Sequence, residues 1–295
     1  MIRPVLQDDA FVADVDTARN SGPGPHVWWL GQSGYLVHLA GRTVLFDPYL
    51  SDSLTRKYAE TDKPHLRMTE RVVAPERLMR IDLVTSSHLH TDHLDAETLR
   101  PVVAANPSVR LVCPESQRAL SRERSGLADD RIVGLDAAFG EGGDRAGDSV
   151  PDLAEVDGIR VEAVPAAHET LERDRHGRML YLGFIVRWGG WSFYHSGDTI
   201  PYPGMEALLA GRGIDVAFLP INGSAPGRRV AGNLWGAEAA RLAKAIGARV
   251  VVPGHYEMFT FNTATTEAFE AECRALGQRY QVLKAGERWE PARED

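Results

Sequence analysis

Three histidines lie around Asp92 in the segment SSHLHTDHLD, residues 86–95, of a chain with 10 histidines in 295 residues. The segment follows the apolar run IDLVTSS, which is typical of a strand, and precedes a helical pattern. His88 and His90 would project on the same side of an extended chain, while Asp92 and His93 turn toward a second point. Imidazole nitrogen and carboxylate oxygen are donors for Zn²⁺, Fe²⁺ and Mn²⁺. The segment therefore predicts a metal site, and the alternative is a hydrogen-bonded loop that is merely rich in histidine.

A pair of metal ions needs about six to eight donors, which is more than this segment holds. We expect the other ligands at strand ends too, in loops of small residues that leave one side of the site open. Three positions fit: His168 in VPAAHET, Asp198 in YHSGDT and His255 in VVPGHYE. His195 lies inside the strand pattern before Asp198, so we expect a packed and hydrogen-bonded histidine there.

The elements that would position these residues form two similar blocks. In each block short β-rich runs are followed by alternating strands and helices, for example VWWL, YLVHLA and TVLFD in the first and MLYLGFIVRW and WSFYHS in the second. This pattern predicts an α/β fold of four layers, an αβ/βα sandwich with two mixed sheets face to face and helices outside. We expect one domain over residues 1–295, with residues 1–20 as an N-terminal helical extension and residues 139–152 as a flexible surface loop.

Taken in order, the motifs HLHTDH, AAHE, SGDT and PGHY resemble the metal-binding motifs of the metallo-β-lactamase superfamily of hydrolases, over nearly the whole chain. The resemblance implies the metallo-β-lactamase fold and two divalent ions, Mn²⁺ or Zn²⁺, with Fe²⁺ also accepted. It implies that Asp47, in VLFDPYL, orients a ligand imidazole, although a turn residue before Pro48 is the alternative. By the same resemblance, one ion would be held by His88, His90 and His168, the other by Asp92, His93 and His255, and Asp198 would bridge them.

Longer stretches, among them WWLGQSGYLVHLAG, RMLYLGFIVRWGGWSFYHSGDT and HYEMFTFNT, resemble the L-ascorbate-6-phosphate lactonase branch of this superfamily. That resemblance implies a cytoplasmic hydrolase in which metal-activated water opens a small, phosphorylated lactone or ester. The branch has no histidine at the third motif, whereas this chain has His168, which favours a fuller two-metal site and leaves the substrate open. The alternative function is a phosphodiester hydrolase of the phospholipase type on the same bimetal scaffold.

Two further sets of residues are expected near the reacting group. Asp92 and Asp198 are the carboxylates that could pass a proton to the leaving group, and Asp92 is preferred because a bridging Asp198 would be more constrained. A phosphorylated substrate also needs an anchor, and guanidinium groups bind phosphate through two hydrogen bonds. The residues predicted to contact substrate, with solvent exposure or core packing as the alternative, are Asn222, Arg228, Arg229 and Tyr256.

The overall charge and composition limit the partners. A formal net charge of -8 argues against capture of nucleic acid or an anionic membrane, so a small, anionic molecule is the expected partner. Cys113 and Cys273 are the only cysteines, which favours free thiols in the cytoplasm over a disulfide framework. No run approaches the roughly 18 apolar residues of a membrane span. The lactonase relatives form oligomers, so the resemblance also allows a homo-oligomer.

Overall fold

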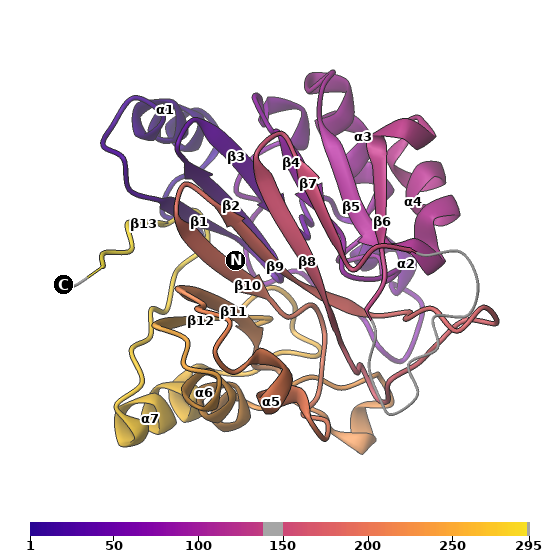
Figure 1. The fold of residues 1–295 in the computed structure, drawn as a ribbon, viewed down its shortest axis with the longest axis vertical. Coiled ribbons are helices and arrows are strands. Elements are labelled where there is room, and N and C mark those ends of the chain that lie inside the picture. The colour runs from indigo at the N-terminus through magenta and orange to yellow at the C-terminus, as the bar shows by residue number, and fades with distance from the viewer. Residues whose placement is uncertain (138–149, 294–295) are drawn as a thin grey trace.

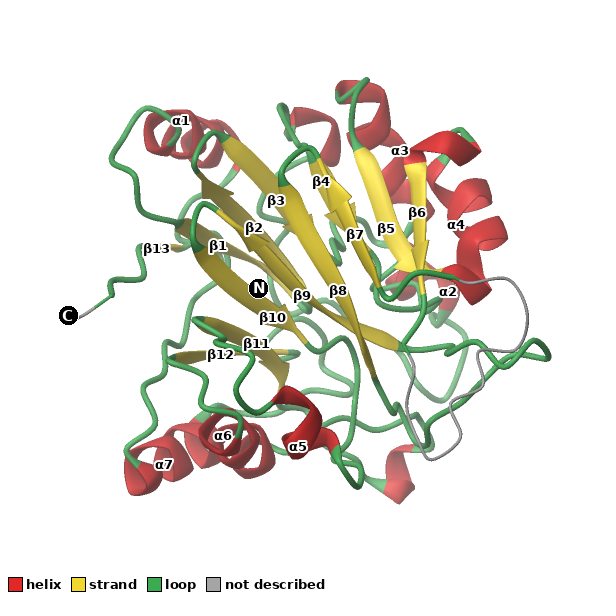
Figure 2. Ribbon diagram, in the orientation of Figure 1, coloured by secondary structure: helices red, strands yellow, loops and turns green. Residues whose placement is uncertain are grey.

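Two β-sheets pack face to face in the computed structural model, with helices on their outer sides (Figure 1 and Figure 2). The structure describes residues 1–137 and 150–293. Most of the loop expected over residues 139–152 therefore lies outside the described residues. The four-layer αβ/βα sandwich predicted from the two repeated blocks is confirmed.

The first sheet is antiparallel where hairpins build it and parallel where helices connect its strands. Its strands Gly34–Leu39 and Arg42–Phe46 are joined by a tight turn, in which Ala40 and Gly41 both have positive φ (50° and 74°), as a two-residue hairpin turn requires. The end of the chain returns to pair with the first strand. The strand order is β13-β1-β2-β3-β4-β5-β6, with β1 at His26–Gly31, β2 at Gly34–Leu39, β3 at Arg42–Phe46, β4 at Leu83–Thr85, β5 at Arg110–Pro114, β6 at Ile132–Leu135 and β13 at Arg288–Trp289.

The second sheet repeats this plan. A meander of antiparallel strands, with a tight turn at Gly189 and Gly190, is followed by two parallel strands. The parallel strands are buried along their whole length, as expected where both faces of a sheet are covered. The strand order is β12-β11-β10-β9-β8-β7, with β7 at Leu153–Val156, β8 at Ile159–Pro165, β9 at Leu182–Trp188, β10 at Trp191–His195, β11 at Val216–Pro220 and β12 at Val250–Gly254.

The helix that follows the histidine segment begins at a side-chain cap. Asp95 accepts a hydrogen bond from the backbone N–H of Thr98 at 3.0 Å, which caps the helix that follows the histidine segment. The helix after β5 begins at Arg118, because Pro114 ends the strand and a 3₁₀ turn intervenes. The helices are α1 (Asp8–Ala18), α2 (Ser53–Lys57), α3 (Ala96–Ala105), α4 (Arg118–Ser125), α5 (Met205–Leu209), α6 (Gly236–Ala245) and α7 (Glu267–Leu276), and the 3₁₀ turns are Pro75–Arg77, Glu115–Gln117, Asp129–Arg131 and Pro226–Arg228.

Aromatic side chains fill the space between the sheets. Tyr35 of β2 stacks on Phe218 of β11 with ring centroids 4.1 Å apart, and both rings are buried. The indole of Trp188, in β9, donates a hydrogen bond to the carbonyl of Leu39, in β2, at 3.0 Å. These contacts join strands of the two sheets directly, so each sheet covers the apolar face of the other.

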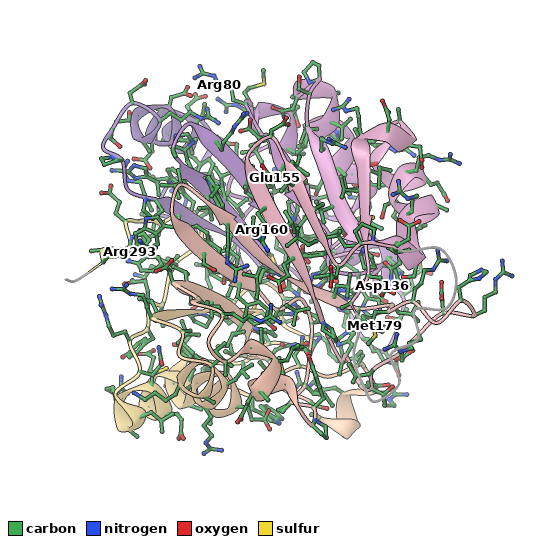
Figure 3. All side chains as sticks on the ribbon, in the orientation of Figure 1. Arg80, Asp136, Glu155, Arg160, Met179 and Arg293 are labelled. Atoms are coloured by element: carbon green, nitrogen blue, oxygen red, sulfur yellow. The ribbon has the colours of Figure 1, made fainter. Side chains whose placement is uncertain are left out.

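Charged side chains lie on the outside of this sandwich, as Arg80, Glu155 and Arg160 do in Figure 3. Cys113 and Cys273 are both buried and free, which confirms the prediction of free thiols. Among residues 1–137 and 150–293, no helix has the length and apolar character that crossing a membrane requires.

Candidate metal centre

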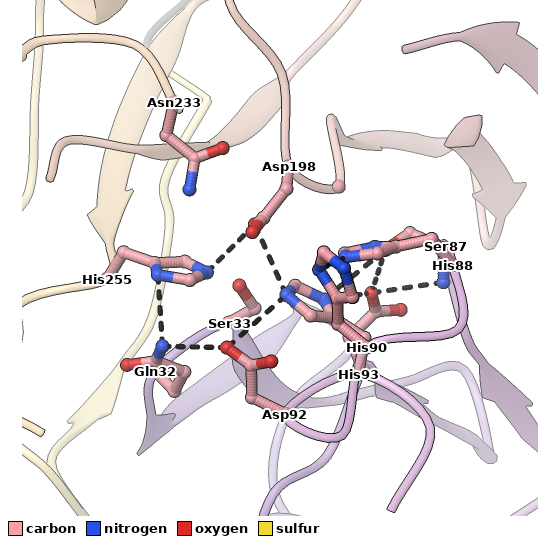
Figure 4. Close-up of polar contacts among 12 residues, drawn as sticks. Gln32, Ser33, Ser87, His88, His90, Asp92, His93, Asp198, Asn233 and His255 are labelled. Carbon is pink, nitrogen blue, oxygen red and sulfur yellow. Dashed lines mark hydrogen bonds and ion pairs between the residues drawn. The ribbon is translucent and has the colours of Figure 1, made fainter. Parts of the chain in front are cut away.

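The carboxyl ends of β4, β8, β10 and β12 meet at one place, and the loops that leave them carry every histidine and aspartate predicted to bind metal. Most of these residues are drawn in Figure 4. Because β4 belongs to the first sheet and the other three strands to the second, the site is built by both halves of the fold. The residues that come together are His88, His90, Asp92, His93, His168, Asp198 and His255.

One group of donors consists of His88, His90 and His168, whose ligand atoms lie within 4.8 Å of one another. Nε2 of His88 and Nδ1 of His90 are 3.0 Å apart. Burial lowers the pKa of His88 and that of His90, so both imidazoles are neutral and have a lone pair to offer. Nδ1 of His168 lies 2.8 Å from the carbonyl oxygen of Gly232, which can only accept, so Nε2 is the atom left for a metal.

The second group consists of Asp92, His93 and His255, and Asp198 stands between the two groups. Its Oδ1 lies 2.8 Å from Nε2 of His255 and 3.2 Å from Nε2 of His93. Its Oδ2 lies 3.5 Å from Nε2 of His168, which belongs to the first group. One carboxylate therefore faces imidazoles of both groups, the position that a bridging ligand requires.

Three buried atoms at the centre of this cluster face one another without hydrogen-bond geometry: Oδ1 of Asp198, with Nε2 of His255 at 2.8 Å and Nε2 of His93 at 3.2 Å. Buried polar atoms are almost always partnered, so such a concentration calls for an explanation. A divalent cation would satisfy all three, because imidazole nitrogen and carboxylate oxygen are its usual ligands. The residues present therefore fit a metal ion.

Asp47, which directly follows β3, contacts His93 of this cluster. Its fully buried carboxylate lies 2.8 Å from Nδ1 of His93 and also accepts hydrogen bonds from the Ser87 backbone N–H (3.1 Å), the Ser87 hydroxyl and the Thr85 hydroxyl (2.8 Å). Burial alone would raise the pKa of Asp47, but interaction with His195 and His93 and the hydrogen bond from Ser87 outweigh it and lower the pKa to about 2. The carboxylate therefore orients His93, as the resemblance implied.

Gln32 is a supporting residue that the sequence analysis did not single out. Its side-chain nitrogen donates to Oδ2 of Asp92 at 2.9 Å and lies 3.0 Å from Nδ1 of His255. Gln32, Asp47 and His255 all have left-handed backbones, with φ of 51°, 34° and 62°. Such conformations cost roughly 1–3 kcal/mol each in non-glycine residues and collect at functional sites. The strain was invisible in the sequence because it depends on the loops that pack around the site.

Gly197 and His195 place Asp198 without entering the cluster. A Cβ atom at Gly197, whose φ is 61°, would lie 2.7 Å from both the Leu182 carbonyl oxygen and Cβ of Ser87, so only glycine fits between them. His195 accepts a hydrogen bond from Gly197 N at 3.2 Å, and its Nε2 lies 2.9 Å from the Ser33 carbonyl oxygen. Both ring nitrogens are thus satisfied, which confirms that His195 is a packed histidine.

The family follows from a match over most of the chain: residues 42–256 match the family described as the beta-lactamase superfamily domain. The chain belongs to the beta-lactamase superfamily. A UPF0173 metal-dependent hydrolase from Rubrobacter xylanophilus is 28% identical over 275 residues, which cover 90% of this chain and 96% of the relative. Superfamily membership thus rests on a segment that contains all seven predicted ligands.

Solved structures of other proteins share the fold of this superfamily member. Igni18, a metallo hydrolase from Ignicoccus hospitalis, aligns with a TM-score of 0.62 and 21% identity, covering 92% of this chain and 99% of its own. An isothiocyanate hydrolase from Delia radicum gut bacteria aligns with a TM-score of 0.67 and 18% identity, covering 90% of this chain and 98% of its own. At such identities the likeness establishes the fold alone.

Beside the superfamily's metal motifs, a cavity of about 240 Å³ opens over the cluster. Four metal-binding candidates line it, namely His90, Asp92, His168 and Asp198, and one edge is aromatic. His65 stacks on Tyr58 with ring centroids 4.5 Å apart and directs its Nδ1 to the Lys63 carbonyl oxygen at 2.8 Å. No sequence motif marks the residues that form the rest of the cavity wall, so they could not be predicted as site residues: Leu54, Lys57, Tyr58, His65, Phe259 and Asn262.

Of the four predicted substrate contacts, only Asn222 and Arg228 lie together in this superfamily member. Asn222 is fully buried, and Arg228 donates hydrogen bonds to Oδ1 of Asn262 (2.7 Å) and to the Asn222 carbonyl oxygen (2.5 Å). Arg229 is exposed and pairs with Asp62. Tyr256 is buried in the core, where its hydroxyl donates to the Leu283 carbonyl and its ring stacks on Trp29 at 4.2 Å. None of the four is among the residues that line the cavity.

Proposed function

We propose that this protein is a metal-dependent hydrolase that opens a small, phosphorylated lactone or ester. The observation that carries the proposal is the convergence of seven donors, three of whose buried atoms face one another without hydrogen-bond geometry at the centre of the cluster. The relative from Rubrobacter xylanophilus, which is named a metal-dependent hydrolase and matches over 96% of its length, supports the same class of reaction. When bound, divalent ions in such a site activate water and polarise a carbonyl oxygen.

Asp92 is our candidate for the residue that donates a proton to the leaving group. Its carboxylate lines the cavity, and Gln32 holds it through Oδ2 alone. Asp198, by contrast, faces the imidazoles of His93, His168 and His255 with its two oxygens. A carboxylate with one oxygen directed by an amide is the better placed of the two to carry a proton to a departing alkoxide.

The size and lining of the cavity support a small substrate with an anionic group. About 240 Å³ is less than the usual range for sites that take drug-sized ligands, roughly 300–1,000 Å³. Lys57 lines the wall together with aromatic and aliphatic side chains and with the polar residues Gln32, Thr91 and Asn262. With the same proposal we keep a cytoplasmic location and a homo-oligomer as predictions.

The test is a hydrolase screen of the protein loaded in turn with Mn²⁺, Zn²⁺ and Fe²⁺, with the bound metal measured by element analysis. Sugar-phosphate lactones and simple esters should be hydrolysed faster than bis(p-nitrophenyl) phosphate. His90→Ala should abolish turnover and lower metal content, because it removes one donor from the first group. His176→Ala, a matched change at an exposed loop histidine, should leave both unchanged.

Two outcomes would count against the proposal. Full activity of the His90→Ala variant would separate turnover from the metal cluster and refute a metal-dependent reaction. Faster hydrolysis of bis(p-nitrophenyl) phosphate than of any lactone or ester would move the assignment to a phosphodiester hydrolase on the same scaffold.

A further inference from the structure

Three asparagines are connected by side-chain hydrogen bonds in a row that ends at Asn262, which lines the cavity. Oδ1 of Asn262 accepts two hydrogen bonds, from Nδ2 of Asn222 at 2.9 Å and from Nη1 of Arg228 at 2.7 Å. Oδ1 of Asn222 in turn accepts from Nδ2 of Asn233 at 3.0 Å. Asn222 and Asn233 are buried, so water does not compete for these contacts. We call Asn233, Asn222 and Asn262 the asparagine relay.

Arg228 sets the direction of the asparagine relay. A guanidinium can only donate, so the atom of Asn262 that faces it must be the carboxamide oxygen and not the nitrogen. The second contact to that oxygen must then come from the NH₂ group of Asn222, which leaves the oxygen of Asn222 to accept from Asn233. Because each step follows from the one before, the NH₂ group of Asn262 is turned away from the relay.

The NH₂ group of Asn262 donates to no described residue, and its nitrogen is not among the fully buried polar atoms that lack a partner. It is thus available at the cavity wall. Lys57 lines the same cavity and forms no ion pair with any residue in the described ranges. The carboxylates among the cavity's described lining residues are Asp92 and Asp198, which belong to the metal cluster. Asn262 and Lys57 therefore add a hydrogen-bond donor and a positive charge to the lining, which an anionic oxygen group would satisfy.

We propose that Asn262 is a substrate-binding residue whose NH₂ group donates to a phosphate-type oxygen of the substrate, and that Arg228 is the positioning residue that orients it. The assignment rests on the proposed function, since it names the group by which that site holds its substrate. Arg228 uses its donors inside the protein, so it acts through Asn262 and not by direct contact with the phosphate.

Binding can be measured without turnover, with phenylphosphonate as a non-hydrolysable anionic probe and benzyl alcohol as its neutral counterpart. In ¹⁵N-labelled, Zn²⁺-loaded protein, the side-chain NH₂ signals of Asn262 are identified by their loss in Asn262→Asp. These signals should shift with phenylphosphonate and not with benzyl alcohol. Asn262→Asp keeps the oxygen that Arg228 needs but removes the donors, so the Kd for phenylphosphonate should rise by at least about tenfold.

Two arginine variants test the positioning role. Arg228→Met keeps an unbranched side chain but removes both hydrogen bonds and the guanidinium that lies over the Trp235 ring, and it should weaken phenylphosphonate binding to a similar degree. Combined with Asn262→Asp it should add nothing further, whereas a merely structural role would give additive losses. Arg229→Met makes the same change in charge at an exposed neighbour and should leave binding unchanged.

The proposal is overturned if phenylphosphonate does not bind, or if it binds without moving the Asn262 signals. It is also overturned if the losses of affinity in Asn262→Asp and Arg228→Met add in the double variant. The binding experiment involves no reaction, so failure of the hydrolase screen can be distinguished from each of these results. Conversely, normal lactone hydrolysis by Asn262→Asp with unaltered KM would refute the role of Asn262 and leave the hydrolase assignment standing.

Discussion

Replacing Asp47 by asparagine should weaken both the fold and the metal site, because the carboxylate accepts from His93, Ser87 and Thr85 while fully buried. The gap between its pKa of about 2 and the ordinary 3.8 corresponds to about 2 kcal/mol of folding free energy at neutral pH. We therefore expect the Asp47→Asn variant to lose about 2 kcal/mol in free energy of unfolding.

The sign of the pH dependence follows from the lowered pKa of Asp47. Its contribution is present above about pH 4, where the carboxyl of the unfolded chain is ionised, and is lost as the pH falls toward 2. The difference between wild type and Asp47→Asn in urea unfolding of the metal-free protein should therefore be full at pH 7 and shrink below pH 4. Metal affinity, measured by competition with a chelating dye, should fall about 10- to 100-fold because His93 is no longer oriented.

A matched control separates these two effects. Asp215 is also a buried carboxylate, which accepts from the Ser192 backbone N–H at 2.9 Å and from Arg293 at 2.7 Å, but it lies at the opposite end of β11 from the metal cluster. Asp215→Asn should lower stability and leave metal affinity unchanged. Equal metal affinity of Asp47→Asn and wild type would refute the reasoning that the carboxylate orients a ligand.

Three other predictions concern the metal, a glycine and the thiols. Removing metal with a chelator should abolish hydrolysis and lower Tm, because a metal at 100 times its Kd stabilises the fold by about 2.7 kcal/mol, and restoring the ion should reverse both changes. Gly197→Ala should cost roughly 1–3 kcal/mol in urea unfolding through its clash with Ser87, and a smaller loss would show that the loop can move. Burial raises the pKa of Cys113 and Cys273 to about 12, so neither thiol should react with a disulfide reagent at pH 8 until the protein is unfolded; rapid labelling of the native protein would contradict this.

The metal ligands could be predicted from sequence because each follows an apolar strand, and strand ends converge in a layered α/β fold. His88 and His255 are far apart in the chain, yet both follow such a run. Gln32 and Asn262 could not be found this way, since their roles depend on contacts with residues more than 30 positions away. For the same reason Arg228 was predicted as a direct phosphate anchor, although its guanidinium turns inward to Asn262.

The cavity wall was beyond prediction for a different reason. Lys57 lies in the five-residue helix α2 and His65 in the irregular segment that follows, where no periodic pattern relates side chains to one face. Only the packing of Tyr58, Phe259 and Phe261 around His65 brings that segment to the site. Such loops vary in length and direction independently of the sheets, so their residues have to be read from the structure.

The division of the ligands between two sheets has a consequence during synthesis of the protein. The ribosome releases His88, His90, Asp92 and His93 with the first sheet, long before His255 at the far end of the second. A growing chain that has folded its first half therefore holds only part of the ligand set and cannot assemble the full centre. Hydrolytic capacity arises at a single late moment, when β12 docks, so unfinished chains in the cell carry no reactive site.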